Sequence, residues 1–252
     1  MGKWKEIKSI FKRWIIALLY PRAANCLCCK DPRKAAFEDC LCDDCREGLK
    51  ERKVPPEACN RCLSPVKKGK PCAFCKSQMM QPIKKVYAPY RYGDEVRQLI
   101  HAFKFDACDE ALPLLADAMT DALTERDFDC IVPVPLHEKR LKQRGFNQSL
   151  LLAQAIGERI QVPVMELLER TEFHKPQSRT AMEKRQKNVE KVFSACEDAK
   201  DKRILLLDDV RTSGSTAWAC ANALKKAGAE SVSLCVAAVV YRGKNRKRQE
   251  KT

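Results

Sequence analysis

Four Cys-x-x-Cys pairs follow one another early in this 252-residue chain and restrict what that region can fold into. They are Cys26 with Cys29, Cys42 with Cys45, Cys59 with Cys62, and Cys72 with Cys75. Each pair can form a knuckle, a tight turn that points two thiolates at one ion, and two knuckles complete the four-sulfur shell of structural zinc. Because the region lacks an apolar core of its own, we expect two structural zinc sites and a segment that is largely unfolded without metal.

The linkers between the pairs hold 12, 13 and 9 residues, which allows sequential pairing or an interleaved cross-brace. We favour sequential pairing, first pair with second and third with fourth. The remaining cysteines lie largely among apolar residues and are interpreted as small core side chains: Cys28, Cys40, Cys108, Cys130, Cys196, Cys220 and Cys235. The three histidines, His101, His137 and His174, are too scattered to suggest a metal site or a catalytic triad.

Charge is concentrated at the two ends of the chain, whose formal net charge is +15. Residues 1–22 hold six Lys or Arg against one Glu, and so do residues 241–252. Solvated basic tails are the common case, although such tails also attract nucleic acid or anionic lipid. No apolar run approaches the ~20 residues of a membrane span, so an integral membrane protein is not expected.

The first residues also carry an apolar stripe at helical spacing, formed by Trp4, Ile7, Phe11, Trp14 and Leu18. The segment lacks the small-residue cleavage site of a signal peptide. Packing against the rest of the protein is the ordinary role of such a stripe, and contact of residues 1–20 with a membrane surface is the alternative. We expect a cytoplasmic protein, or one peripheral at the inner face of the membrane.

A second region begins near residue 81 and alternates apolar strands with helices. Helical stretches cover residues 94–105 and 109–126, followed by the strand at 130–135 and a helix from about Asn147 to Ile160. The strand "RILLLDD", a helix from about Thr216 to Ala227, and the strand "SVSLCVAAVV" come later. This order predicts an α/β fold with a parallel sheet covered by helices on both faces. The predicted division is 1–22 basic amphipathic helix, 23–80 zinc-binding region, 81–241 α/β domain and 242–252 basic tail.

The stretch "LLLDDVRTSGST", residues 205–216, is the best candidate for a ligand site. In a parallel sheet, ligands bind where strands end and loops lead into helices. Asp208 and Asp209 end the apolar strand and can accept hydrogen bonds from vicinal sugar hydroxyls or hold magnesium through water. The loop of Thr212, Ser213, Gly214, Ser215 and Thr216 offers hydroxyls and free N–H groups to a phosphate. An ordinary helix cap is the simpler alternative, but it leaves the acid pair unexplained.

This stretch resembles the phosphoribosyl-pyrophosphate signature of type I phosphoribosyltransferases, with Ser213 where Thr is more usual. "VPVPLHEKRLKQRGFNQSLLLA" at 132–153, "RTEFHKPQSRTAMEKRQKNV" at 170–189 and the cysteine pairs narrow the resemblance to the ComF family of competence-associated phosphoribosyltransferase-like proteins. The likeness spans residues 20–241. It implies a type I phosphoribosyltransferase-like domain preceded by a double zinc ribbon.

The resemblance also implies roles for residues. Asp208 and Asp209 would bind the ribose hydroxyls, and residues 212–216 would bind the 5′-phosphate of phosphoribosyl pyrophosphate, with magnesium. Arg140 and Arg144 are the candidates for pyrophosphate contact, because a guanidinium grips phosphate oxygens in pairs. Asn147 and Gln148 belong to the "RGFNQ" block, where Asn147 is also a natural helix cap. Residues 171–191 resemble a hood that closes over substrate, with four side chains able to reach it: Lys175, Gln177, Arg179 and Arg185.

Three functions remain open at this stage. The first is a pentosyl transferase or sugar-phosphate-binding protein of competence and DNA uptake, which contacts single-stranded DNA and competence proteins. Since aromatic residues make up only 7% of the chain, that contact should be dominated by the DNA backbone and weaken with salt. The second is a nucleobase-salvage transferase with a structural zinc module. The third is a non-catalytic partner of a membrane-bound uptake complex. The acceptor of any transfer is not identified by the sequence.

Overall fold

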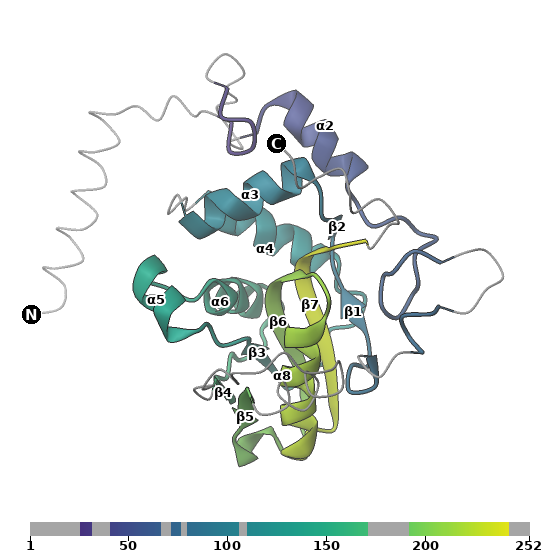
Figure 1. Ribbon diagram of the computed structural model, residues 1–252, viewed down its shortest axis with the longest axis vertical. Helices are drawn as coiled ribbons and strands as arrows, with labels where there is room; N and C mark the ends of the chain where they lie inside the picture. Colours follow the sequence, from purple (N-terminus) through teal and green to yellow (C-terminus); the bar gives the residue numbers. More distant parts are fainter. Residues whose placement is uncertain are drawn as a thin grey trace, which may run out of the picture.

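A parallel sheet forms the centre of the molecule (Figure 1). The computed structural model describes residues 26–31, 41–66, 72–76, 80–105, 110–170 and 192–241. The strand order is β3 (Cys130–Pro133), β6 (Arg203–Arg211), β7 (Ser231–Val239) and β1 (Val86–Tyr87). β2 (Tyr90–Arg91) continues the edge begun by β1, because both short strands pair with β7 in parallel.

Strand β6 shows why the sheet is covered on both faces. Its four apolar residues 204–207 are at most 1% exposed, and they alternate between two cores. Ile204 and Leu206 belong to one core, whereas Leu205 and Leu207 belong to the other. A continuous apolar run without polar alternation is typical of a parallel strand buried from both sides, so the predicted parallel sheet is confirmed.

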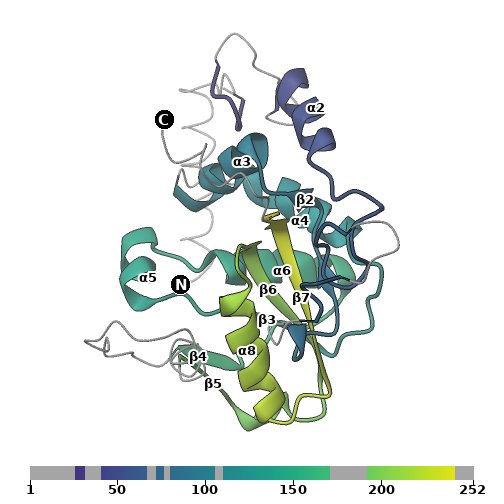
Figure 2. The ribbon, with the colours of Figure 1, turned by 45° about the vertical axis from the view of Figure 1, so that its right-hand side comes forward.

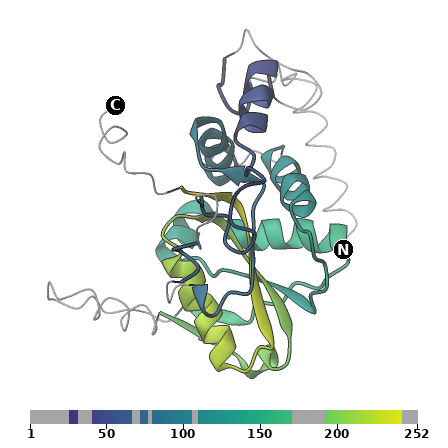
Figure 3. The ribbon, with the colours of Figure 1, turned by 90° about the vertical axis from the view of Figure 1, so that its right-hand side faces the viewer.

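Helices cover the two faces of the sheet unequally (Figure 3). On one side lie α3 (Asp94–Phe105), α4 (Ala111–Asp121) and α6 (Gln148–Ile160). On the other side lies α8 (Ser215–Lys226), together with an antiparallel pair formed by β4 (Leu168–Arg170) and β5 (Phe193–Ala195). The predicted α/β architecture with both faces covered is therefore present.

The connection between β3 and α6 contains a short helix that the sequence analysis did not predict. Helix α5 (Glu138–Arg144) has no buried residue and projects from the margin of the molecule (Figure 2). His137 Nδ1 accepts a hydrogen bond from the Lys139 N–H at 3.1 Å, and Gly145 ends the helix at φ +80°. A seven-residue helix without an apolar stripe leaves no periodic signal in the sequence.

The structure tests part of the interpretation of the unpaired cysteines. Cys130, Cys220 and Cys235 are fully buried, and Cys28 is 2% exposed, so all four are core side chains as predicted. The prediction is wrong for Cys196, which is exposed because it stands in the turn that precedes the 3₁₀ helix η3 (Glu197–Ala199). Cys40 and Cys108 lie outside the described residues.

The two charged ends also fall outside the described part of the chain, and with them the predicted stripe from Trp4 to Leu18 and the tail 242–252. Among the described residues, no helix combines the length and the apolar character needed to cross a bilayer.

Candidate functional site

The acid pair lies at the carboxyl end of β6. The Ser149 hydroxyl of α6 donates a hydrogen bond to Asp208 Oδ1 at 3.3 Å, and the Asp209 N–H donates to the same oxygen at 2.9 Å. Asp209 forms an ion pair with Lys104 near the end of α3. Elements from three parts of the chain therefore fix the two carboxyl groups.

Burial makes the two acids unequal. Burial and the neighbouring Asp209 raise the pKa of Asp208 from 3.8 to about 7, against the opposing effects of the Asp209 N–H, Lys104 and Ser149. Two adjacent carboxylates in a poorly hydrated place do not ionise independently. Asp208 is therefore partly protonated near neutral pH, and a ligand that needs its carboxylate ionised binds better as pH rises.

The loop after β6 has the shape of an anion cradle. Gly214 has φ +84°, in the left-handed region that favours glycine, and it stands directly before α8. The Ser213 and Ser215 hydroxyls are 2.8 Å apart, and the Ser215 N–H donates to Ser213 Oγ at 3.3 Å. The free N–H groups at the start of α8 and the positive end of its dipole point toward this loop.

The acids and the loop surround a common space. A cavity of about 20 Å³ is lined by Asp208, Val210, Arg211, Thr212, Gly214, Ser215, Thr216, Ala217 and Val236. Five of the seven sequence-predicted sugar-phosphate residues line this cavity. The other two adjoin it: Asp209 is held beside it by Lys104, and Ser213 is hydrogen-bonded to Ser215.

The lining residues among the seven are Asp208, Thr212, Gly214, Ser215 and Thr216. All seven residues therefore lie at one end of β6.

The two arginines proposed for pyrophosphate lie on α5, next to this edge of the sheet. Arg144 Nη1 donates a hydrogen bond to Gln148 Oε1 at 3.1 Å. Burial and the nearby Arg140 lower the pKa of Arg144, while the charge of Asp209 opposes them. Arg140 is exposed. Arg144 is therefore within electrostatic reach of the acid pair, and Arg140 faces solvent beside it.

The "RGFNQ" block joins α5 and α6 to the strands. Asn147 caps α6, since its Oδ1 accepts from the Ser149 N–H at 3.1 Å and its Nδ2 donates to the Val134 carbonyl at 3.2 Å. The ring of Phe146 packs against Phe103 of α3 with centroids 6.4 Å apart. These contacts are structural, in line with the predicted capping role of Asn147. The hood candidates Lys175, Gln177, Arg179 and Arg185 lie outside the described residues, between β4 and β5.

Three residues at this edge were missed by the sequence analysis: Lys104, Ser149 and Arg211. Lys104 is the last basic residue of a helix whose predicted position was right, but nothing local indicates that it meets an acid 105 positions later. Arg211 stands inside the quoted signature, where it was read only as part of the motif. It is 5% exposed, and its guanidinium lies 4.9 Å from the centre of the Phe74 ring.

The eight paired cysteines form two groups, each with its sulfur atoms within 4.8 Å of one another. One group is Cys26, Cys29, Cys42 and Cys45, and the other is Cys59, Cys62, Cys72 and Cys75. The predicted sequential pairing is thus the arrangement found. Sulfur–sulfur distances of 3.4 to 3.8 Å across the pairs fit four ligands around one tetrahedral ion at about 2.3 Å from each sulfur.

Backbone N–H groups prepare the first cysteine of each group for an ion. Burial raises the pKa of Cys26, but N–H groups of Cys42, Cys29 and Cys28 outweigh it and bring the value to about 7. In Cys59, burial is likewise outweighed by the N–H groups of Cys62 and Arg61, again to about 7. Hydrogen bonds that favour a thiolate also favour metal binding. Each group can therefore hold a metal ion.

The two groups attach to different parts of the α/β domain. The first belongs to the core on the α3 and α4 side, and α2 (Asp43–Glu51) leads from it toward α3 (Figure 1). The second belongs to the core on the α8 side. Residues near the second group and residues at the start of the loop line one cavity of about 190 Å³. Its lining is Ser64, Pro65, Cys72, Ala73, Phe74, Arg211, Thr212 and Val240.

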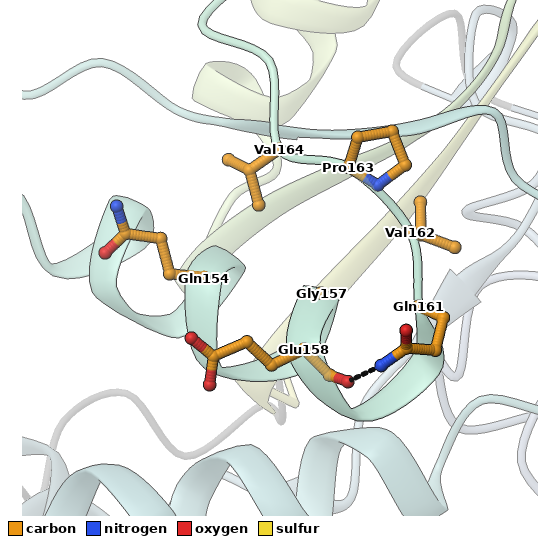
Figure 4. A pocket seen from close by; sticks show the side chains of 7 residues that line it. All are labelled: Gln154, Gly157, Glu158, Gln161, Val162, Pro163 and Val164. Atoms are coloured by element: carbon orange, nitrogen blue, oxygen red, sulfur yellow. Dashed lines mark hydrogen bonds between the residues drawn. The ribbon is translucent and has the colours of Figure 1, made fainter.

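A larger and more open cavity of about 400 Å³ lies elsewhere (Figure 4). The residues around it come from the end of α6 and the segment that follows: Gln154, Gly157, Glu158, Gln161, Val162, Pro163 and Val164. Val164 bridges to Ile131 near the start of β3, whereas the acids stand at the strand ends. This cavity is therefore separate from the acid and loop site, and it carries no basic side chain for a phosphate.

Comparison with known proteins agrees with this description. The family described as "Phosphoribosyl transferase domain" matches residues 147–252. Competence protein F of Haemophilus influenzae is 28% identical over 206 residues, covering 77% of this chain and 88% of that protein. Competence protein ComFC of Bacillus subtilis is 26% identical over 211 residues, covering 77% and 81%. DNA utilization protein YhgH of Escherichia coli K12 is 28% identical over 203 residues, covering 77% and 88%.

Among solved structures, purine phosphoribosyltransferase from Pyrococcus horikoshii has a TM-score of 0.33 at 18% identity, over 50% of this chain and 70% of that chain. The parallel sheet and the domain match over residues 147–252 give the chain the fold of a phosphoribosyl transferase domain. With two four-cysteine groups ahead of that domain, the chain resembles these competence and DNA-utilization proteins over 77% of its length.

Proposed function

We propose that this protein binds phosphoribosyl pyrophosphate with magnesium at the carboxyl end of β6 and acts in the uptake or handling of single-stranded DNA. The observation that carries the first half is the shared edge at which Asp208, Asp209 and the loop 212–216 meet. The carboxylates accept the ribose hydroxyls, the loop N–H groups hold the 5′-phosphate, and Arg144 lies where it can meet the pyrophosphate. Magnesium offsets the negative charge of the pyrophosphate.

Calorimetric titration with phosphoribosyl pyrophosphate and magnesium tests this site. The double variant Asp208→Ala plus Asp209→Ala should lose binding, because both hydroxyl acceptors are gone. A matched control replaces another adjacent acid pair, Glu197 and Asp198, which is exposed in η3 before β6 begins. The control should bind like the wild type. Equal binding by the wild type and the Asp208 and Asp209 variant would refute the assignment.

The second half of the proposal draws on the relatives, whose names associate them with competence and DNA utilization. The formal net charge of +15 supports attraction to a polyanion. Affinity for a mixed-sequence single strand should fall steeply as salt rises, since each phosphate contact releases counterions. Removing residues 242–252, which hold a cluster of Lys and Arg, should reduce that salt dependence. Binding that is absent, or that does not change with salt, would contradict the DNA role.

A nucleobase transferase remains the second candidate, and one observation favours it. The cavity of about 190 Å³ opens beside Thr212 and combines apolar walls with the Ser64 and Thr212 hydroxyls, as small-molecule sites commonly do. A planar acceptor there would lie next to the proposed sugar site. Pyrophosphate release in the presence of one purine or pyrimidine, and not of others, would support transfer. The absence of release with every base, despite sugar-phosphate binding, would favour binding without transfer.

A further inference from the structure

Arg211 is a buried cation that, among the described residues, meets an aromatic ring and forms no ion pair. Its side chain is 5% exposed, and its Nε has no hydrogen-bond partner within the described residues. Within the same residues, none of the ion pairs involves its guanidinium. Moving an unpaired charge out of water costs several kcal/mol. A buried guanidinium that persists in a fold therefore indicates a compensating negative group nearby.

The second cysteine group is in the right place to be that group. Cys72 and Phe74 line the same cavity as Arg211. Burial lowers the pKa of Arg211, and negative charge on Cys62, Tyr241, Cys72 and Cys75 opposes that effect. Four thiolates around one divalent ion carry a net charge of −2. A metal-loaded group of this kind is a counter-charge for Arg211, whereas four protonated thiols are not.

Phe74 connects the same group to the phosphate loop. It stands between Cys72 and Cys75 in the chain, so the knuckle fixes its backbone. One face of its ring meets the Arg211 guanidinium at 4.9 Å from the ring centre, a separation that suits a cation–π contact. Its Cζ lies 3.4 Å from the place where a Cβ on Gly214 would be. The ring thus bridges the knuckle and the turn of the loop, and Arg211 directly precedes Thr212.

We propose that Phe74 and Arg211 are positioning residues that couple metal in the second cysteine group to the shape of the phosphate loop. Metal holds the knuckle and supplies the counter-charge of Arg211; the knuckle holds Phe74 against Gly214. Loop order then depends on metal, and a ligand in the loop slows loss of that metal, since coupling between two sites is reciprocal. The ligand half of this statement rests on the proposed function, whereas the loop half does not.

Hydrogen exchange of the amides in residues 212–218 tests the loop half without any ligand. Phe74→Ala should raise their exchange rate roughly tenfold, because the loop loses the ring that packs on it. Cys28→Ala is the matched control, since Cys28 holds the same third position in the first knuckle and packs toward α3 instead. The control should leave these amides unchanged. Unchanged exchange in Phe74→Ala, at two metal ions per chain, would overturn the proposal.

Should Phe74→Ala lose metal, Phe74→Leu replaces it in the same measurement. Leucine keeps an apolar contact with Gly214 but gives up the cation–π contact, so an intermediate exchange rate is expected. Exchange equal to that of the wild type in Phe74→Leu, together with full metal content, would exclude a role for the aromatic ring.

Metal release to a chelator tests the role of Arg211. Arg211→Met should speed release from the second group by roughly ten- to hundredfold, the usual effect of removing an outer partner of a metal site. Arg211→Lys, which keeps the charge, should remain near the wild-type rate, and release from the first group should not change. Equal release rates in Arg211→Met and the wild type would contradict the counter-charge.

Adding phosphoribosyl pyrophosphate and magnesium separates this proposal from the proposed function. Saturating ligand should slow release from the second group in the wild type and have little effect in Phe74→Ala. A wild type that binds no ligand in calorimetry refutes the proposed function, and the exchange and release data still decide the coupling. A wild type that binds ligand without any change in metal release refutes the coupling alone.

Discussion

The two cysteine groups share one ligand pattern and differ in what their knuckles touch. In the first, the side chain before the second cysteine of the knuckle is Cys28, whose Sγ donates to the Glu95 carbonyl of α3 at 3.5 Å. In the second, the equivalent side chain is Phe74, which meets Arg211 and Gly214. The first group therefore fixes a helix, and the second fixes a loop that can hold a ligand.

The difference shows that the residues between the ligands decide what a knuckle contributes. Both groups can hold an ion, and both bury apolar side chains in a core of the α/β domain. The presence of metal can affect the loop 212–216 only through a side chain that contacts this loop, as Phe74 does. The following predictions compare the first group and its surroundings with the second.

Removal of one ligand from each group should have the largest and most unequal effects. Cys75→Ser should raise the dissociation constant for phosphoribosyl pyrophosphate roughly tenfold or more, because it weakens metal binding in the group that carries Phe74. Cys45→Ser should lower the melting temperature but change that constant less than twofold. Metal analysis and calorimetry on both variants measure this. Equal losses of affinity would mean that the two groups act alike.

Asp208→Asn should change the pH dependence of the free energy of unfolding. The folded protein keeps a proton on Asp208 up to about pH 7, whereas the unfolded chain loses it near 3.8. Stability therefore falls as pH rises through this window. The variant should exceed the wild type by roughly 1–3 kcal/mol at pH 8 and match it at pH 4. Denaturant unfolding at both pH values measures the difference; a constant difference would contradict the raised pKa.

Gly214→Ala and Gly48→Ala compare the contact of the loop with Phe74 and the contact of α2 with Glu95. Gly214→Ala should cost roughly 1–2 kcal/mol and weaken ligand binding, since alanine is strained at φ +84° and its Cβ meets Phe74. Gly48→Ala in α2 should change stability by about 1 kcal/mol or less, because alanine favours a helix and this offsets the shift of the Glu95 side chain, whose atoms lie nearest to the new Cβ. Ligand binding should stay normal in Gly48→Ala, and weakened binding there would break the comparison.

Glu95→Gln should have the smallest effect, beside the first group. Burial raises the pKa of Glu95, but its own N–H and Arg52 outweigh burial and leave the pKa lowered. The pair with Arg52 spans 3.0 Å, with side chains 36% and 27% exposed, so its loss should cost under about 1 kcal/mol at neutral pH. This contribution disappears as pH falls through the lowered pKa of Glu95, whereas the contribution of Asp208 disappears as pH rises. Unfolding curves at pH 7 and pH 3.5 measure it.

The parts of the molecule that were predicted correctly are those determined by residues close together in the sequence. The run 204–207, the acids that follow it and the glycine turn are adjacent in the chain, so one stretch indicated strand, site and helix together. The spacing of the cysteines indicated two four-cysteine groups but allowed two pairings, of which the favoured sequential one is the arrangement found. Helix α5 was missed because a short polar helix has no periodicity.

Long-range pairing was not predictable in the same way. Lys104 meets Asp209 only because α3 packs across the end of β6. Arg211 meets Phe74 because the second knuckle lies on the α8 side of the sheet. The Arg211 guanidinium covers one face of the Phe74 ring. Neither contact can be predicted from the residues that adjoin Lys104 or Arg211 in the sequence.

The strand order has a consequence for how the chain matures during translation. β7 is flanked by β6 on one side and by β1 and β2 on the other, yet it follows all of them in the chain. During translation β1, β2 and β6 are therefore synthesised before β7, and the strand edges that pair with β7 stay unpaired until it is made. The cysteine pairs emerge much earlier and can capture ions while the sheet is still open. We expect nascent chains halted before residue 231 to hold metal but to lack a finished sugar-phosphate site.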